Sequence, residues 1–190
     1  EVSKHKQHPT KGKVTRVLKP STHRTTPPCP YFGTCGGCQW QHIKYPYQLE
    51  LKRQILRSQL EEIGKIDNPY VTPTIASPKP WAYRNHARFS VNRDGSLGFT
   101  KVGTRSHLKI EQCRLMHQQI NAVLTEIQDR CQEKRQVSVR SSTETNTLLV
   151  QPTFEEVGMS FSSGQDHYYE ALFGYWFKVS SPSFFQVNVQ

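Results

Sequence analysis

The spacing of apolar residues predicts two amphipathic helices. The first covers residues 45–64, where Pro46 suits the first helical turn and Gly64 suits the left-handed position just after a helix end. Its apolar face consists of Leu49, Leu56, Leu60 and Ile63. The second helix covers residues 115–134. Its apolar stripe consists of Met116, Ile120, Val123, Leu124, Ile127 and Cys131.

Residues outside these helices alternate between apolar and polar, as β-strands do. Residues 86–102 predict a hairpin that turns at Asp94-Gly95, and a short strand follows at 107–110. Residues 137–151 predict a second hairpin, and residues 174–179 predict a further strand. Runs of strands with two separate helices are typical of an α+β fold with antiparallel sheets.

The first 28 residues are polar and contain one candidate strand, at residues 13–18. A single strand has no sheet to join, and the proline-rich stretch at 25–28 interrupts regular structure. We interpret this segment as a linker or as the last strand of a preceding domain.

The chain has a net charge of +10, and two segments carry the positive charge. Residues 1–28 contain seven Lys or Arg against one Glu, and residues 79–114 contain eight against two acidic residues. A polyanion such as RNA is the natural partner of such clusters, because each neutralised phosphate releases counterions. The alternative is a solubilising tail and a solvated strand face. No apolar run is long enough to span a membrane or to act as a secretory signal, so we expect a cytoplasmic protein.

The basic hairpin is predicted to have one cationic face. Arg88 has the same strand parity as Arg84 and the opposite parity to Phe89, so the arginines and the apolar residues lie on different sides. Arg105 follows on the return strand. We expect Arg84, Arg88 and Arg105 to contact RNA, with a merely solvated face as the alternative.

Three of the five cysteines form a C-x5-C-x2-C motif at Cys29, Cys35 and Cys38, in a loop rich in glycine. The odd cysteine count and the lack of a signal sequence argue against disulfides. A zinc ribbon usually has a second C-x2-C pair, so the spacing favours an iron–sulfur centre and leaves zinc as the alternative. Cys113 is the expected remote ligand, and Cys131 on the helical stripe is expected to be a buried, inert thiol.

Five segments in the same order resemble the iron–sulfur-containing RNA uracil-5-methyltransferases, of the 23S ribosomal RNA type. They are CPYFGTCGGCQWQHIKYPYQLELKRQIL, YRNHARFSV, LGFTKVGT, IEQC and SFFQVN. The resemblance implies a 4Fe–4S cluster on Cys29, Cys35, Cys38 and Cys113. It also implies that residues 1–28 end a TRAM domain, that 29–180 form the central iron–sulfur and RNA-binding domain, and that 181–190 begin the connection to a Rossmann-like methyltransferase domain.

The same resemblance implies formation of 5-methyluridine from S-adenosylmethionine, in ribosomal RNA in preference to transfer RNA. Phe184 is expected to stack on the flipped uracil, and Gln186 to contact the uracil edge or the methyl donor. The nucleophile and base are expected in the later domain, so no catalytic residue is assigned here, and the chain alone is expected to be an inactive, monomeric fragment. The alternative function is a non-catalytic RNA-binding module that carries zinc or an iron–sulfur cluster.

Overall fold

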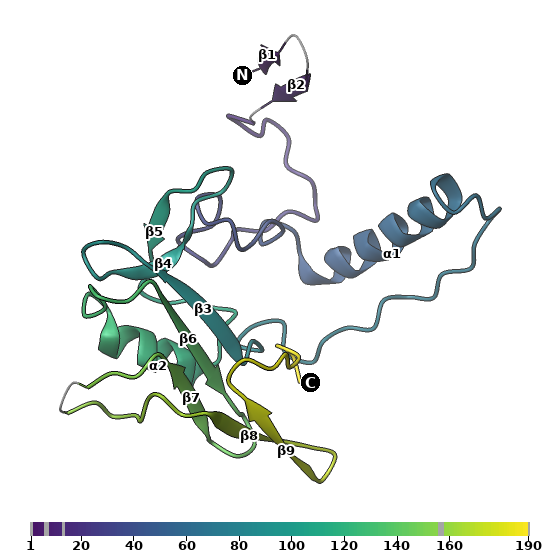
Figure 1. Cartoon of the computed structure of the whole chain (residues 1–190). Coiled ribbons are helices and arrows are strands. Elements are labelled where there is room, and N and C mark those ends of the chain that lie inside the picture. The colour runs from purple at the N-terminus through teal and green to yellow at the C-terminus, as the bar shows by residue number, and fades with distance from the viewer. Residues whose placement is uncertain (1, 6–7, 13, 156–157, 190) are drawn as a thin grey trace.

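The computed structural model describes residues 2–5, 8–12, 14–155 and 158–189, and its centre is a five-stranded antiparallel sheet of order β5-β4-β3-β6-β7. The strands are β3 (His86–Val91), β4 (Leu97–Thr100), β5 (His107–Lys109), β6 (Gln136–Ser141) and β7 (Leu148–Gln151). Figure 1 shows α2 (Gln118–Ile127) against this sheet. The two predicted hairpins and the α+β class are therefore confirmed.

The core lies between α2 and one face of the sheet. Ala87 and Phe89 are fully buried there, whereas Arg88 between them is exposed, as the alternation predicted. All six residues of the predicted helical stripe are buried. The helix is shorter than predicted, because Gln128 leaves the helical conformation and its side chain accepts from the Leu97 N–H (2.6 Å) and donates to the Ile110 carbonyl (2.7 Å). Helix α2 therefore ends where the Gln128 side chain forms hydrogen bonds with backbone groups of Leu97 and Ile110.

A second, two-stranded sheet is formed by β8 (His167–Leu172) and β9 (Tyr175–Ser180). Tyr168 and Val179 pack against Leu149 of β7, and Leu149 alternates with Val150, which faces α2. The hairpin therefore covers the other face of the central sheet, at its β7 end. The sequence predicted β9 but missed β8, because the buried positions of β8 include Glu170, which interrupts the apolar alternation.

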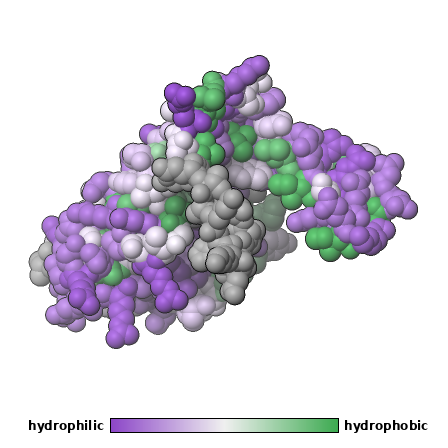
Figure 2. All heavy atoms as spheres, turned by 90° about the horizontal axis from the view of Figure 1, so that it is seen from above, coloured by the Kyte–Doolittle hydropathy of each residue, from purple (hydrophilic) through white to green (hydrophobic). Residues whose placement is uncertain are grey.

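Helix α1 (Tyr45–Glu62) projects from the body as an arm, with no buried residue (Figure 1). Figure 2 shows hydrophobic side chains exposed among hydrophilic ones on this arm. Leu56 is 48% exposed and Ile63 is 78% exposed, whereas Leu49 and Leu60 are half-buried, so the described residues cover the predicted apolar face only in part. The left-handed residue after the helix is Lys65 (φ 53°), whereas the sequence predicted Gly64.

The N-terminal segment differs from the prediction. Strands β1 (Val2–His5) and β2 (His8–Gly12) form a small antiparallel hairpin. The strand predicted at residues 13–18 is absent over 14–18, and residue 13 lies outside the described residues. Val14 and Leu18 are 77% and 80% exposed, since no neighbouring strand pairs with this segment. Among the described helices, none has the length and apolarity needed to cross a membrane.

Candidate functional site

The four cysteines predicted as ligands line one cavity of about 550 Å³. Cys29, Cys35 and Cys38 come from the loop before α1, and Cys113 comes from the segment before α2. All four thiols are partly exposed and free of disulfides. The fold therefore brings together cysteines that lie far apart in the sequence.

The cysteine loop is fixed to the end of β4. Gly36 N–H donates to the Thr100 carbonyl (3.0 Å), and Val102 N–H donates to the Thr34 carbonyl (2.9 Å). A Cβ on Gly36 would lie 3.2 Å from the Thr100 oxygen, so this close approach favours glycine. The Gly37 nitrogen lies 3.4 Å from the Cys35 sulfur, to which its N–H donates, so a backbone N–H of the loop approaches one of the thiols.

Cys113 is held by polar side chains that the sequence analysis did not single out. Asn121 of α2 accepts from the Cys113 N–H (2.8 Å) and donates to its carbonyl (3.1 Å). The Tyr31 hydroxyl accepts from the Glu111 N–H (2.8 Å), which ties the loop to the segment before Cys113. No local pattern marks these residues, because their role depends on contacts across the fold.

The charges around the cavity suit an anionic group. Burial raises the pKa of the Cys113 thiol, while the N–H groups of Leu115 and Met116, which point at its sulfur, act in the opposite direction. Arg84 also lines the cavity, and its Nε is buried with no hydrogen-bond partner among the described residues. Such N–H donors stabilise thiolates and sulfides.

The described residues contain no group of three or more His, Cys, Asp or Glu side chains close enough to bind a single metal ion. The four thiols surround a cavity instead. A four-iron cluster takes four cysteine ligands, and four thiols line this cavity. The donor set, the free Arg84 Nε and the cavity together fit an iron–sulfur cluster.

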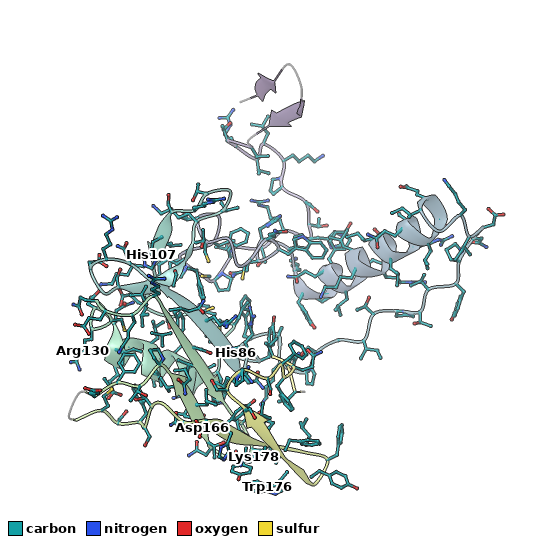
Figure 3. The ribbon with its side chains drawn as sticks, in the orientation of Figure 1. His86, His107, Arg130, Asp166, Trp176 and Lys178 are labelled. Atoms are coloured by element: carbon teal, nitrogen blue, oxygen red, sulfur yellow. The ribbon has the colours of Figure 1, made fainter. Side chains whose placement is uncertain are left out.

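A second feature is the cluster of arginines around His86, on the sheet face opposite α2. The pKa of His86 is lowered from 6.5 to about 4, first by burial and then by the guanidinium groups of Arg140, Arg88 and Arg84 in that order. Figure 3 shows His86 on the sheet, between the cysteine region and the β8–β9 hairpin. Arg105 lies apart, in the exposed turn between β4 and β5. Arg140 was missed by the sequence analysis, since its strand looks like an ordinary alternating one.

The segment that contains Phe184 and Gln186 follows β9 and is fixed to the sheet. Arg140 donates to the Ser183 carbonyl (2.5 Å), and Asn85 N–H donates to the Val187 carbonyl (3.0 Å). Phe184 is 80% exposed, and Gln186 is exposed as well. The structure thus presents both predicted pocket residues to solvent from an anchored backbone.

The chain is similar to several proteins named RNA methyltransferases, although no protein-family model matches it. An uncharacterized RNA methyltransferase of Aquifex aeolicus is 32% identical, over 99% of this chain and 52% of the relative. Similar relatives from Halalkalibacterium halodurans and Listeria monocytogenes are 36% and 41% identical, over 64% and 55% of this chain and 27% and 24% of their own lengths.

The fold also matches a solved structure. The Pyrococcus abyssi tRNA (uracil-54, C5)-methyltransferase in complex with S-adenosyl-L-homocysteine aligns with a TM-score of 0.67 and 20% identity, over 100% of this chain and 53% of that one. The chain spans about half the length of the Aquifex relative and of this structure. It is therefore homologous to a part of proteins named RNA methyltransferases and shares its fold with a part of one of known structure.

Proposed function

We propose that this chain is the RNA-binding and substrate-positioning part of an S-adenosylmethionine-dependent RNA methyltransferase that forms 5-methyluridine, with ribosomal RNA as the favoured substrate. The observation that carries the proposal is the exposed segment with Phe184 and Gln186, anchored beside the arginines around His86. Support comes from relatives named RNA methyltransferases and from the fold shared with a uracil methyltransferase bound to S-adenosyl-L-homocysteine.

The chemistry explains why such a segment is needed. Carbon 5 of uracil is a poor nucleophile, so a thiolate outside this chain adds at carbon 6. Carbon 5 of the resulting enolate attacks the sulfonium methyl group of S-adenosylmethionine, and the methyl–sulfur bond breaks to release S-adenosyl-L-homocysteine. A base then removes the proton from carbon 5, and the thiolate leaves. The uracil must leave its stack to react. Phe184 stacks on the extruded ring, and the Gln186 carboxamide donates to and accepts from the uracil edge or contacts the methyl donor.

Within the same proposal, Cys29, Cys35, Cys38 and Cys113 hold a 4Fe–4S cluster. Cys29, Cys35 and Cys38 would hold the cluster from the loop before α1 and Cys113 from the segment before α2, so the cluster would tie these two segments together, and methyl transfer would need no electron from it. Residues 1–28 are proposed as the end of an RNA-binding TRAM domain, and 181–190 as the connection to the domain that holds the methyl donor.

Cysteine variants test the cluster. The protein isolated without oxygen is expected to be brown and to contain about four irons per chain. Cys113→Ser should lose most of this iron, whereas Cys131→Ser, which changes a buried thiol outside the cavity, should retain it. Stoichiometric zinc without iron in the anaerobic protein would overturn the cluster and favour the non-catalytic zinc module.

Methyl transfer tests the activity. The full-length protein is incubated with radiolabelled S-adenosylmethionine and with either 23S ribosomal RNA or transfer RNA. We expect 5-methyluridine in the ribosomal RNA, and a loss of roughly 10²-fold in rate for Phe184→Ala, because the uracil is no longer held in position. Tyr70→Ala, which removes an aromatic ring that is 88% exposed elsewhere, is the control. Methylation of transfer RNA alone would overturn the ribosomal assignment, and no methylation of either RNA would overturn the activity.

A further inference from the structure

We propose that the outer face of the β8–β9 hairpin binds unpaired RNA bases by stacking. This proposal rests on the proposed function, because it takes RNA as the partner. The outer face is defined by cross-strand pairs, since residues directly opposite each other share one side of an antiparallel sheet. It consists of His167, Tyr169 and Ala171 of β8, with Ser180, Lys178 and Trp176 opposite them on β9.

Three rings on this face form a continuous row. The ring centroids of His167 and Tyr169 are 5.2 Å apart with the planes nearly perpendicular, and those of Tyr169 and Trp176 are 6.3 Å apart. Trp176 is 69% exposed and Tyr169 is 39% exposed. Figure 3 shows Trp176 and Lys178 near each other on the hairpin. The row therefore offers accessible ring surface next to an ammonium group.

The hairpin is a firm support for these rings, because its inner face is anchored to the body. Tyr168 and Val179 are buried against β7, and the buried Glu170 carboxylate accepts from the Ser142 hydroxyl (2.7 Å). The Thr147 hydroxyl donates to the Tyr169 carbonyl (2.8 Å). Rings on a fixed backbone lose little conformational entropy when a ligand binds.

The composition of the outer face favours RNA over an apolar protein partner. The row has no carboxylate and no branched aliphatic side chain, and each ring carries a polar group. Bases stack on aromatic rings while a neighbouring cation contacts the phosphates, which is how single strands are bound without sequence preference. Lys178 supplies that cation beside Tyr169, on a chain whose net charge is +10.

The opposite face of the same hairpin gives a matched control. Tyr175 pairs with Leu172 on the inner side and is 71% exposed. It thus resembles Trp176 in exposure and in position along β9 but points the other way. A contact made by the outer face alone should not involve Tyr175.

The test is RNA binding by the full-length protein, measured by fluorescence anisotropy with a hairpin RNA that has an unpaired loop and with a fully paired RNA of equal length. Base–aromatic stacking contributes about 1–3 kcal/mol per base, so Trp176→Ala should weaken binding of the looped RNA by roughly 5–150-fold. Trp176→Phe should retain most of the affinity, and Tyr175→Ala should bind as the parent does. Binding of the paired RNA should be unchanged in all three variants.

The outcomes separate this inference from the proposed function. Parent-like binding by Trp176→Ala and by Tyr169→Ala, in a protein that binds RNA and transfers methyl groups, overturns the stacking face and leaves the proposed function intact. An equal loss in Tyr175→Ala also overturns it, because a general loss of apolar surface would then explain the effect. A parent that binds no RNA at all overturns both. Thermal unfolding of each variant shows that the hairpin remains folded.

Discussion

At the scale of single residues, polar side chains that are half-buried or buried fix the segments around the site. Asn121 fixes the backbone of Cys113, Gln128 joins α2 to the sheet, and Arg140 holds the segment that leads to Phe184. These contacts span 8, 31 and 43 positions of the sequence, respectively. The cysteine motif was readable from local spacing, whereas the residues that position it were not, because a lone Asn or Gln carries no periodic signal.

His86 leads to a prediction about pH. Its pKa is about 4 in the folded protein, lowered by burial and then by Arg140, Arg88 and Arg84, and 6.5 is its usual value. Between these values the unfolded chain binds a proton that the folded chain does not. The contribution of His86 to stability is therefore fully present above pH 6.5 and is lost as the pH falls towards 4.

The measurement is the free energy of unfolding in urea at pH 7 and at pH 5, for the parent and for His86→Gln. Because the imidazole is partly exposed, we expect the parent to lose about 1 kcal/mol more than the variant over this range, after allowance for solvent screening. The Ser138 hydroxyl, 3.0 Å from Nε2, can still bond to the glutamine side chain. An identical pH dependence in the two proteins would contradict the prediction.

At the scale of elements, the two helices show what periodicity can and cannot predict. Both have apolar faces at helical spacing, yet the face of α2 is buried and that of α1 has no fully buried residue and is largely exposed at Leu56 and Ile63. Periodicity identifies a helix and its apolar side, but it cannot say which surface covers that side. Strand β8 was missed for a related reason, since Glu170 occupies an inward position that alternation would assign to an apolar residue.

A matched pair of leucines tests this difference. Leu124 of α2 is fully buried in the core, and Leu56 of α1 is 48% exposed. Leu124→Ala should lower the free energy of unfolding by about 2–5 kcal/mol, because it removes buried methyl groups and leaves a cavity. Leu56→Ala should change it by roughly 0.5 kcal/mol or less, as substitutions on exposed surfaces usually do. Urea unfolding measures both, and similar losses in the two variants would mean that α1 is covered in solution.

At the scale of the whole molecule, positively charged side chains lie away from the hydrophobic core. The sequence predicted the cationic side of β3, and the structure places Arg88 there in the open, while Arg84 turns towards the cysteine cavity. The α+β class and most strands followed from local patterns. The packing of the β8–β9 hairpin and the projection of α1 did not, because both depend on contacts distant in sequence.

Salt dependence tests whether this charge binds RNA. The affinity for RNA should fall by roughly 0.7–0.9 log units per log unit of salt for each phosphate neutralised. Replacing the exposed Arg88 and Arg105 by Gln should make this slope shallower by the contribution of up to two phosphate contacts. A salt titration followed by fluorescence anisotropy measures the slope. Removal of residues 1–12 provides the comparison. If that truncation abolishes binding while the double variant binds like the parent at every salt concentration, the arginines are only solvated surface.

The cysteines that line the cavity come from two separate segments of the chain, and this has a consequence for synthesis on the ribosome. Cys38 and Cys113 are 75 positions apart in the chain, and both are needed to line the cavity. At a translation rate of about 5–20 residues per second, the loop thiols are made roughly 4–15 s before the thiol that completes the set. During that interval the nascent chain has three thiols and no closed site. Oxidants in the cell can reach them then more easily than at any time after α2 has folded.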